Sequence, residues 1–444
     1  MSALARRLAA LVLVASLPLG ATPLWAQAPP SDVRIDISGA GRRIRIHCES
    51  LAAQGDRNAG SFSVQADEVV AHDLDWSGVF TVSRAWASGQ QPFDVQAIVG
   101  GKFTVSGSQV KLSGEVRDFP ARRPILVKEY RGPLTNWRRL AHQFADDIVF
   151  QFTGEAGVAQ TEIAFVVQSG RTKELCVMDY DGADLRALTA DKSIAISPAW
   201  SPDASLILFT SYKGGTGPRV HVVPSDGGKP FLVSGRNGLN TSAMYSPDGR
   251  EIACTLSQDG NPEIYLLDAR GGSPRRLTNV RGIDTSPAWS PTGREIAFTS
   301  DRGGSPQVYV MDRDGGNVHR LNFELGYTDS PAWSPKGDRI AFVSRTGGGF
   351  DIYTCKADGS DTRLIVTGGS NENPHWSPDG RHLVFASNRD NAFGLWVSDL
   401  DGTPPRKLDT GGRVALSPAW SPRRSGDGSA INLNDARPSS GGQR

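Results

Sequence analysis

The chain carries the segment Ser197-Pro-Ala-Trp-Ser-Pro-Asp203 and repeats it, with small changes, along its C-terminal half. The later copies are Ser242-Ala-Met-Tyr-Ser-Pro-Asp-Gly249, Ser286-Pro-Ala-Trp-Ser-Pro-Thr-Gly293, Ser330-Pro-Ala-Trp-Ser-Pro-Lys-Gly337, Asn373-Pro-His-Trp-Ser-Pro-Asp-Gly380 and Ser417-Pro-Ala-Trp-Ser-Pro422. Their aromatic residues are Trp200, Tyr245, Trp289, Trp333, Trp376 and Trp420, at intervals of 45, 44, 44, 43 and 44 residues. A period of about 40–45 residues is typical of β-propeller blades.

Each repeat unit carries the four strand signals that a blade needs. The first strand contains the Pro-x-Trp motif and ends in a Ser-Pro-Asp-Gly turn, where Pro and Gly favour a tight turn. The second strand is short and apolar, as at Ile296–Ser300, and the third alternates, as at Val308–Asp312. A short outer strand then ends in Arg-Leu-Thr or a similar sequence, as at Arg275–Thr278.

The two ends of the array predict how the ring closes. Residues 163–189 supply a second, a third and an outer strand but lack the first, whereas the last unit has only the first strand, around Trp420. The two fragments make one blade, so we predict a six-bladed β-propeller closed by its C-terminal strand, which removes the free sheet edges. The six repeated aromatic residues should be structural, each packing against the next blade and contributing about 1.5–3 kcal/mol.

The N-terminus predicts export. Arg6 and Arg7 precede the apolar run Leu8–Leu19, which is too short for the roughly 20 residues that span a bilayer. Residues 1–28 therefore indicate a signal peptide, cleaved near the small residues Ala26 or Ala28. We expect an exported chain in the periplasm without direct membrane insertion.

The region between the signal and the repeats predicts a small α/β domain, residues 29–155. The expected strands are 43–47, 80–82, 95–99, 101–105, 110–116 and 125–130, and the expected helices are 64–74 and 134–152. The propeller should occupy residues 160–422. The tail 423–444, rich in Ser, Gly, Asp and Arg, should be disordered.

Composition and motifs exclude several kinds of chemistry. The 48 Lys and Arg residues nearly balance the 47 Asp and Glu residues, so charge alone does not favour nucleic acid. The four cysteines form no C-x-x-C pair and are expected to be buried, small hydrophobic residues rather than disulfides. Because the chain has no G-x-S-x-G, H-E-x-x-H or P-loop motif, we expect no catalytic residues, no cofactor and no metal.

Two weaker patterns involve carboxylates. The segments Asp179-Tyr-Asp-Gly182, Asp312-Arg-Asp-Gly315 and Asp399-Leu-Asp-Gly402 resemble the start of a calcium loop but lack its third acidic position and its distant Glu. Since they recur at one point of the repeat, turn chemistry explains them better. His142 and Asp146 share a helix face, which favours a surface contact over a metal site.

Strand direction puts the loops that precede the first strands on the same propeller face as the loops joining the second and third strands. Polar residues occupy these lead-in loops, and we expect them at the mouth of the central channel, where they would hold a peptide or a loop by hydrogen bonds. The candidates are Asn240, Thr241, Asp284, Thr285, Thr328, Asp329, Glu372 and Asn373. The alternative is ordinary capping of the turns between blades.

Taken together, these features resemble the TolB family, a periplasmic component of the Tol–Pal cell-envelope system. The resemblance rests on the repeat and on more particular segments, and it covers nearly all of residues 31–422. Those segments are Asp32-Val-Arg-Ile-Asp-Ile37, Asp73-Leu-Asp-Trp-Ser-Gly-Val-Phe80, Ile163-Ala-Phe-Val-Val167, Tyr180-Asp-Gly182 and Pro418-Ala-Trp-Ser-Pro422.

The resemblance implies a non-enzymatic adaptor, a monomer by itself, that links two envelope proteins. Its propeller mouth would dock the peptidoglycan-associated lipoprotein Pal. Its first segment would offer an extended strand to TolA, of the inner-membrane TolA–TolQ–TolR complex. That segment is Asp32, Val33, Arg34, Ile35, Asp36 and Ile37. Such an adaptor would support outer-membrane integrity and invagination during cell division.

Two other readings stay open. One is an exported propeller enzyme, a hydrolase or a lyase, which would need carboxylates or histidines gathered in the channel. The other is a stand-alone propeller that binds an exported ligand, which would have no need of the segment Asp32–Ile37.

Overall fold

The computed structural model describes residues 43–84, 94–215, 217–270 and 272–424. The predicted signal (1–28), the segment Asp32–Ile37 and all but the first two residues of the predicted tail lie outside the described residues. Among the described helices, none has both the length and the apolar character needed to cross a bilayer.

The first part of the described chain is a sheet with two helices. Its elements are β1 (Ile44–Cys48), β2 (Ala52–Gly55), α1 (Ala59–Trp76), β3 (Phe80–Ser83), β4 (Ala97–Ser106), β5 (Gln109–Asp118), β6 (Pro124–Pro133), the 3-10 helix η1 (Leu134–Asn136) and α2 (Trp137–Thr153). The strand order is β3-β1-β4-β5-β6, with β2 paired to β4. Since β1 runs parallel to β3 and β4 while β4, β5 and β6 are antiparallel, the sheet is mixed.

Two strands differ from the sequence prediction. β4 runs unbroken through Gly100 and Gly101, where the sequence predicts two strands, because both glycines stay paired with β5. A Cβ at Gly101 would clash with the backbone carbonyl of Ser113, so close strand approach requires glycine there. β2 was not predicted, since its sequence Ala-Ala-Gln-Gly lacks the β-branched and aromatic residues that signal a strand.

Helix α2 packs on this sheet through an apolar face. Leu140, Phe144 and Ile148 are buried. The Phe144 ring lies where a Cβ on Gly114 of β5 would stand, so the glycine lets the helix approach. Gly154 ends the helix in the left-handed conformation, with φ 71°.

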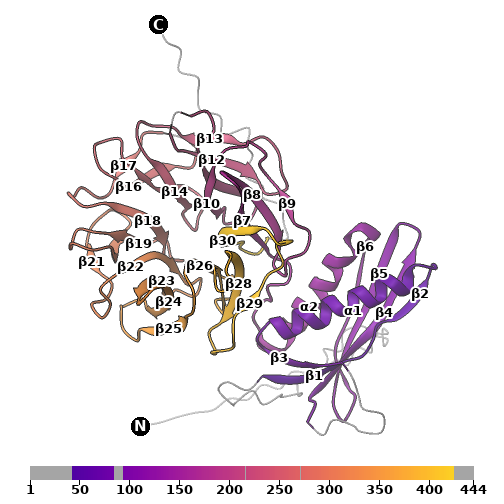
Figure 1. Ribbon diagram of the computed structural model, residues 1–444. Coiled ribbons are helices and arrows are strands. Elements are labelled where there is room, and N and C mark those ends of the chain that lie inside the picture. The colour runs from indigo at the N-terminus through magenta and orange to yellow at the C-terminus, as the bar shows by residue number, and fades with distance from the viewer. Residues whose placement is uncertain (1–42, 85–93, 216, 271, 425–444) are drawn as a thin grey trace, which may run out of the picture. The chain divides into compact units, whose positions relative to one another are not determined.

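The rest of the described chain forms six four-stranded sheets (Figure 1). Five have consecutive strands: β10 (Ala195–Trp200), β11 (Leu206–Ser211), β12 (Arg219–Pro224) and β13 (Phe231–Ser234); β14 (Asn240–Tyr245), β15 (Glu251–Leu256), β16 (Glu263–Asp268) and β17 (Arg275–Arg276); β18 (Asp284–Trp289), β19 (Glu295–Ser300), β20 (Gln307–Asp312) and β21 (His319–Arg320); β22 (Thr328–Trp333), β23 (Arg339–Thr346), β24 (Gly349–Lys356) and β25 (Arg363–Val366); and β26 (Asn371–Trp376), β27 (His382–Ser387), β28 (Gly394–Asp399) and β29 (Arg406–Lys407). The sixth joins β30 (Val414–Trp420) to β7 (Glu162–Ser169), β8 (Thr172–Asp179) and β9 (Arg186–Ala187).

The sixth sheet closes the ring. Ala415 of β30 stands opposite Val167 of β7, and Trp420 stands opposite Ile163. The first and last strands of the propeller therefore lie side by side near the centre of the ring (Figure 1). This confirms the predicted six-bladed propeller closed by its C-terminal strand.

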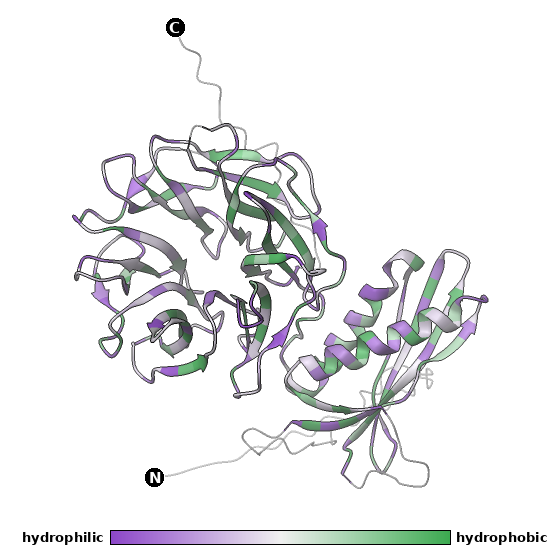
Figure 2. Ribbon diagram, viewed as in Figure 1, coloured by the Kyte–Doolittle hydropathy of each residue, from purple (hydrophilic) through white to green (hydrophobic). Residues whose placement is uncertain are grey.

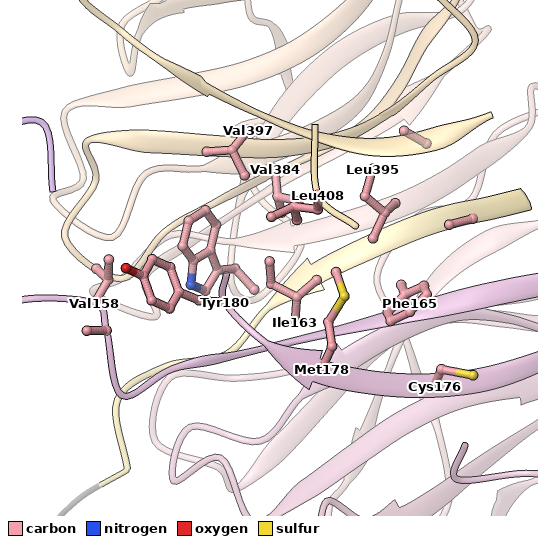
Figure 3. Packing of buried hydrophobic residues seen from close by; sticks show 14 residues of the cluster. Val158, Ile163, Phe165, Cys176, Met178, Tyr180, Val384, Leu395, Val397 and Leu408 are labelled. Carbon is pink, nitrogen blue, oxygen red and sulfur yellow. The ribbon is translucent and has the colours of Figure 1, made fainter. Parts of the chain in front are cut away.

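Apolar side chains of neighbouring blades pack together in buried clusters, and Figure 2 shows hydrophobic residues along several of the propeller strands. In Figure 3, Ile163 and Met178 of the closing blade face Val384 and Leu408 of the blade before it. The repeated aromatic residues lie in these layers, but the neighbour that each contacts is the preceding blade and not the next one. Trp200, for example, donates its indole N–H to the carbonyl of Ala419 at 2.9 Å. The four cysteines are free and buried.

Every innermost strand contains the same backbone bulge. The residue at this position has a positive φ of 47–53° in all six blades, and it lies within the break in strand pairing, between the last paired residue before it and the next paired residue after it. The residues are Ser197, Ser242, Ser286, Ser330, Asn373 and Ser417. A short polar residue suits this conformation better than a bulky or β-branched one.

Candidate functional site

The lead-in loops lie beside the hairpins that join the second and third strands. The backbone N–H of Leu239 donates to Ser257 Oγ at 2.8 Å, and in the next blade Ile283 N–H donates to Asp301 Oδ1 at 2.6 Å. Ser370 N–H makes the equivalent bond to Asn388 Oδ1 at 2.7 Å. The two sets of loops therefore share one side of the propeller, which we call the loop face.

Three of the predicted partner-binding residues are buried at the start of their strands. Asn240 accepts a hydrogen bond from Ser234 Oγ at 2.7 Å, and the Asp284 carboxylate pairs with Arg302 at 2.8 Å. Thr328 accepts a hydrogen bond from the backbone N–H of Val308 at 2.8 Å. Asn240 and Thr328 thus bond to the preceding blade and Asp284 to its own blade, which is the turn capping that the sequence left open as the alternative. In this conformation the three buried side chains offer no surface to a partner.

The other five predicted residues occupy the second and third positions of these strands and are partly or fully exposed: Thr241, Thr285, Asp329, Glu372 and Asn373. The Asp329 carboxylate accepts two side-chain hydrogen bonds, from Thr299 Oγ1 at 2.8 Å and from Tyr327 Oη at 3.2 Å. Glu372 accepts one from Ser370 Oγ at 3.1 Å. These five residues form the polar part of the loop face.

Sequence reasoning missed an apolar part of the same face. Ile194, Leu239 and Ile283 stand immediately before the innermost strands of three successive blades and are 36%, 36% and 48% exposed. Their positions are equivalent, since each carbonyl accepts the backbone N–H of the first residue after the second strand. We call these three residues the apolar arc. Lone apolar residues in loops give no periodic signal, although comparing this position across repeats would have found them.

Arginines are held in place at the hairpins of the blade that carries Ile283 and of the two blades after it. Arg302, Arg345 and Arg389 stand at the ends of β19, β23 and β27. Each guanidinium lies 4.9 Å from an aromatic ring centroid, that of Tyr309, Tyr327 and Trp396 respectively. Stacking of this kind fixes a cation without removing its charge. The loop face thus combines exposed apolar side chains, hydrogen-bonding groups and ordered arginines.

Among the described residues, the side-chain groups that could hold a metal ion lie away from the loop face. Within the part of the chain that the structure describes, the only close groups of three or more His, Cys, Asp and Glu residues share Asp181, in the turn after β8. The fold and this face therefore define a six-bladed β-propeller, preceded by a small α/β domain, with a mixed polar and apolar loop face.

Comparison with known proteins places this propeller in a family. The family model described as TolB beta propeller domain matches residues 150–424, and the chain belongs to this family. The result confirms the resemblance that the repeat segments indicate.

Individual relatives carry the same name. The chain is 38% identical over 223 residues to the Tol-Pal system protein TolB of Anaeromyxobacter dehalogenans (strain 2CP-1 / ATCC BAA-258), covering 47% of this chain and 51% of that protein. It is 37% identical over 262 residues to the Tol-Pal system protein TolB of Anaeromyxobacter sp. (strain K), covering 55% and 59%. The matches thus span little more than half the length of these curated relatives.

A solved structure matches over a longer stretch. The crystal structure of TolB from Acinetobacter baumannii is similar with a TM-score of 0.76 at 27% identity, covering 86% of this chain and 97% of that chain. The similarity therefore includes most of the α/β domain as well as the propeller.

Proposed function

We propose that the chain is a non-enzymatic adaptor of the Tol–Pal system, acting in the periplasm after removal of residues 1–28. In this proposal it links Pal, bound at the loop face, with TolA, bound by the segment Asp32–Ile37. Family membership and the names of the relatives support a Tol–Pal role in general. The structural observation that carries the proposal is the apolar arc, because exposed apolar side chains at equivalent positions of adjacent blades are typical of a protein-binding surface.

The proposed Pal contact has an apolar part and a polar part. Ile194, Leu239 and Ile283 would be covered by the partner, since buried apolar anchors supply most of the affinity of a typical interface. Thr241, Thr285, Asp329, Glu372 and Asn373 would supply the polar contacts that set specificity. Asn240, Asp284 and Thr328 would act indirectly, by holding the lead-in loops in shape.

The proposed TolA contact rests on the resemblance. Val33, Ile35 and Ile37 alternate with polar residues, a pattern suited to an extended strand that adds to the edge of a partner sheet. An adaptor that joins the two partners would couple the inner-membrane complex to the outer membrane and so support its integrity and its invagination during division. The proposal needs no cofactor and treats the free chain as a monomer.

A recovery experiment with envelope proteins tests the proposal. The purified chain, used as bait, should recover both Pal and TolA. Deletion of Asp32–Ile37 should abolish recovery of TolA and leave Pal, whereas L239E combined with I283E should abolish Pal and leave TolA. Recovery of neither partner by a bait whose circular dichroism shows it to be folded would overturn the proposal.

A further inference from the structure

Five histidine and aspartate side chains gather where helices α1 and α2 contact the turn after β8. Their ligand atoms form two groups in which all atoms lie within 4.8 Å of one another. One group is His142, Asp179 and Asp181, and the other is His72, Asp73 and Asp181. The sequence could not show this cluster, because its members come from three separate stretches of the chain.

His142 is fixed with one ring nitrogen free. The residue is 4% exposed, and its Nδ1 lies 2.6 Å from Asp73 Oδ2. The other oxygen of Asp73 accepts a hydrogen bond from Tyr180 Oη at 2.7 Å, which holds the carboxylate in place. His142 Nε2 is buried without any hydrogen-bond partner. A histidine that ligates a metal almost always donates its other ring N–H to a carboxylate in this way.

The free nitrogen points at two carboxylates. Nε2 of His142 lies 4.0 Å from Asp179 Oδ2, which is too long for a hydrogen bond. Two ligand atoms that each lie about 2.1 Å from one tetrahedral metal ion are about 3.4 Å from each other. A small movement of His142 and Asp179 toward each other would therefore let both bind the same ion.

The cluster also has an excess of negative charge. Arg138 pairs with Asp181 and lies 3.5 Å from Asp179, but this single guanidinium faces three carboxylates, since Asp73 is also close.

A cavity borders the cluster. His142 and Asp179 line a cavity of about 580 Å³, together with Arg138 and Asp146. His142 Nε2 itself is buried, so an ion in the cavity would reach it after a movement of the surrounding side chains, and the cavity has room for water to complete the coordination shell.

We propose that His142 Nε2 and the carboxylates of Asp179 and Asp181 bind one divalent transition-metal ion of the Zn²⁺ type. One imidazole and two carboxylates suit such an ion. Asp73 orients the histidine, Arg138 moves away from Asp181, and any proton on Nε2 is released. The bound ion ties α2 to the turn after β8, so the site is a clamp between the α/β domain and the propeller. This inference does not depend on the proposed adaptor function.

Zinc titration of the purified, metal-stripped chain tests the site, with a chromophoric chelator as competitor. We expect one equivalent of Zn²⁺ to bind with micromolar or higher affinity and to raise the midpoint of thermal unfolding. H142N keeps a donor that can reach Asp73 but lacks Nε2, and D179N removes one ligand charge in a side chain of the same shape. Each should lower the affinity at least about tenfold.

The matched control is H382N. His382 is also buried, lies 2.7 Å from Asp399 and has a free Nε2, but it belongs to no group of three ligands among the described residues. Its substitution should leave the zinc affinity unchanged. The visible spectrum of bound Co²⁺ gives a second readout and should be lost in D179N.

Two results would overturn the inference. One is the absence of stoichiometric zinc binding by the wild-type chain. The other is unchanged zinc affinity in whichever of H142N and D179N keeps the wild-type circular dichroism spectrum.

Discussion

At Ser286 the backbone enters the left-handed region, with φ 53°, and five equivalent residues do the same in the other blades. The residue that follows is Pro in five of the six blades. Because proline has no backbone N–H, it leaves no unpaired donor at this point of the bulge. The sequence shows the Ser-Pro pair, but only the structure shows that the serine has a left-handed backbone conformation.

Substitution of Ser286 measures this selection. S286V should lower the free energy of unfolding by about 1–2 kcal/mol, because a β-branched residue is strained at positive φ. S286G, which relieves the strain, should be neutral or slightly stabilising. Urea unfolding of both variants gives the comparison, and equal stabilities of S286V and the wild type would contradict this account of the bulge.

The carboxyl group of Asp399 should make the stability of the fold depend on pH. Burial alone would raise its pKa, but the hydrogen bond from His382 and the charges of His382 and Arg406 together hold the pKa below its ordinary value of 3.8. Arg43 adds a further pair at 3.0 Å. Because the folded pKa is lowered, the stabilisation is present above about pH 4 and is lost as the pH falls through the folded pKa.

D399N should therefore be less stable than the wild type near pH 7, by roughly 1–3 kcal/mol, because the buried partners lose their counter-charge. The difference should shrink near pH 3, where the wild-type carboxyl takes up a proton. Denaturant unfolding at the two pH values measures the gap. A gap of the same size at both would show that Asp399 does not act through its charge.

Among the elements, β30 has the most demanding position, because it alone joins the end of the propeller to its beginning. Trp420 is 2% exposed and donates its indole N–H to Thr161 Oγ1 at 2.8 Å. Its ring stacks near Tyr180 and His382, with centroids 6.4 Å and 6.1 Å away. The Trp420 side chain thus contacts both the start of the propeller, at Thr161 and Tyr180, and the preceding blade, at His382.

Truncation of this side chain tests the closure. W420A should lower the free energy of unfolding by about 3–5 kcal/mol, the usual effect of removing a fully buried aromatic side chain. The matched control W333A should cost clearly less, because Trp333 holds the same repeat position but is only partly buried and its indole N–H has no partner. Chemical denaturation measures both, and similar losses would mean that closure makes no special demand on Trp420.

The elements also show what could be predicted from sequence. The regular spacing of Trp200 to Trp420 and the complementary ends of the array were enough for the six blades and their closure. Periodicity reports position in a repeat but not burial, so it grouped Asn240, Asp284 and Thr328 with exposed neighbours. It was also silent on Ile194, Leu239 and Ile283, and it could not bring His142 to Asp179, because tertiary packing alone unites them.

At the scale of the whole molecule, the claim that matters most is that the loop face is a binding surface for Pal. The near-zero net charge suits recognition through local groups more than through a broad field. The apolar arc and the five exposed polar residues supply such groups, and no part of the zinc clamp is needed for them to act.

Calorimetric titration of the purified chain with the periplasmic domain of Pal tests this claim most directly. We expect saturable binding by the wild type and at least about a tenfold loss with L239E combined with I283E, because a buried charge at an apolar anchor is costly. V127E should bind like the wild type, since Val127 is an equally apolar, 68% exposed residue of β6, outside the propeller. Absence of Pal binding by the folded wild type, or equal binding by all three chains, would contradict the account.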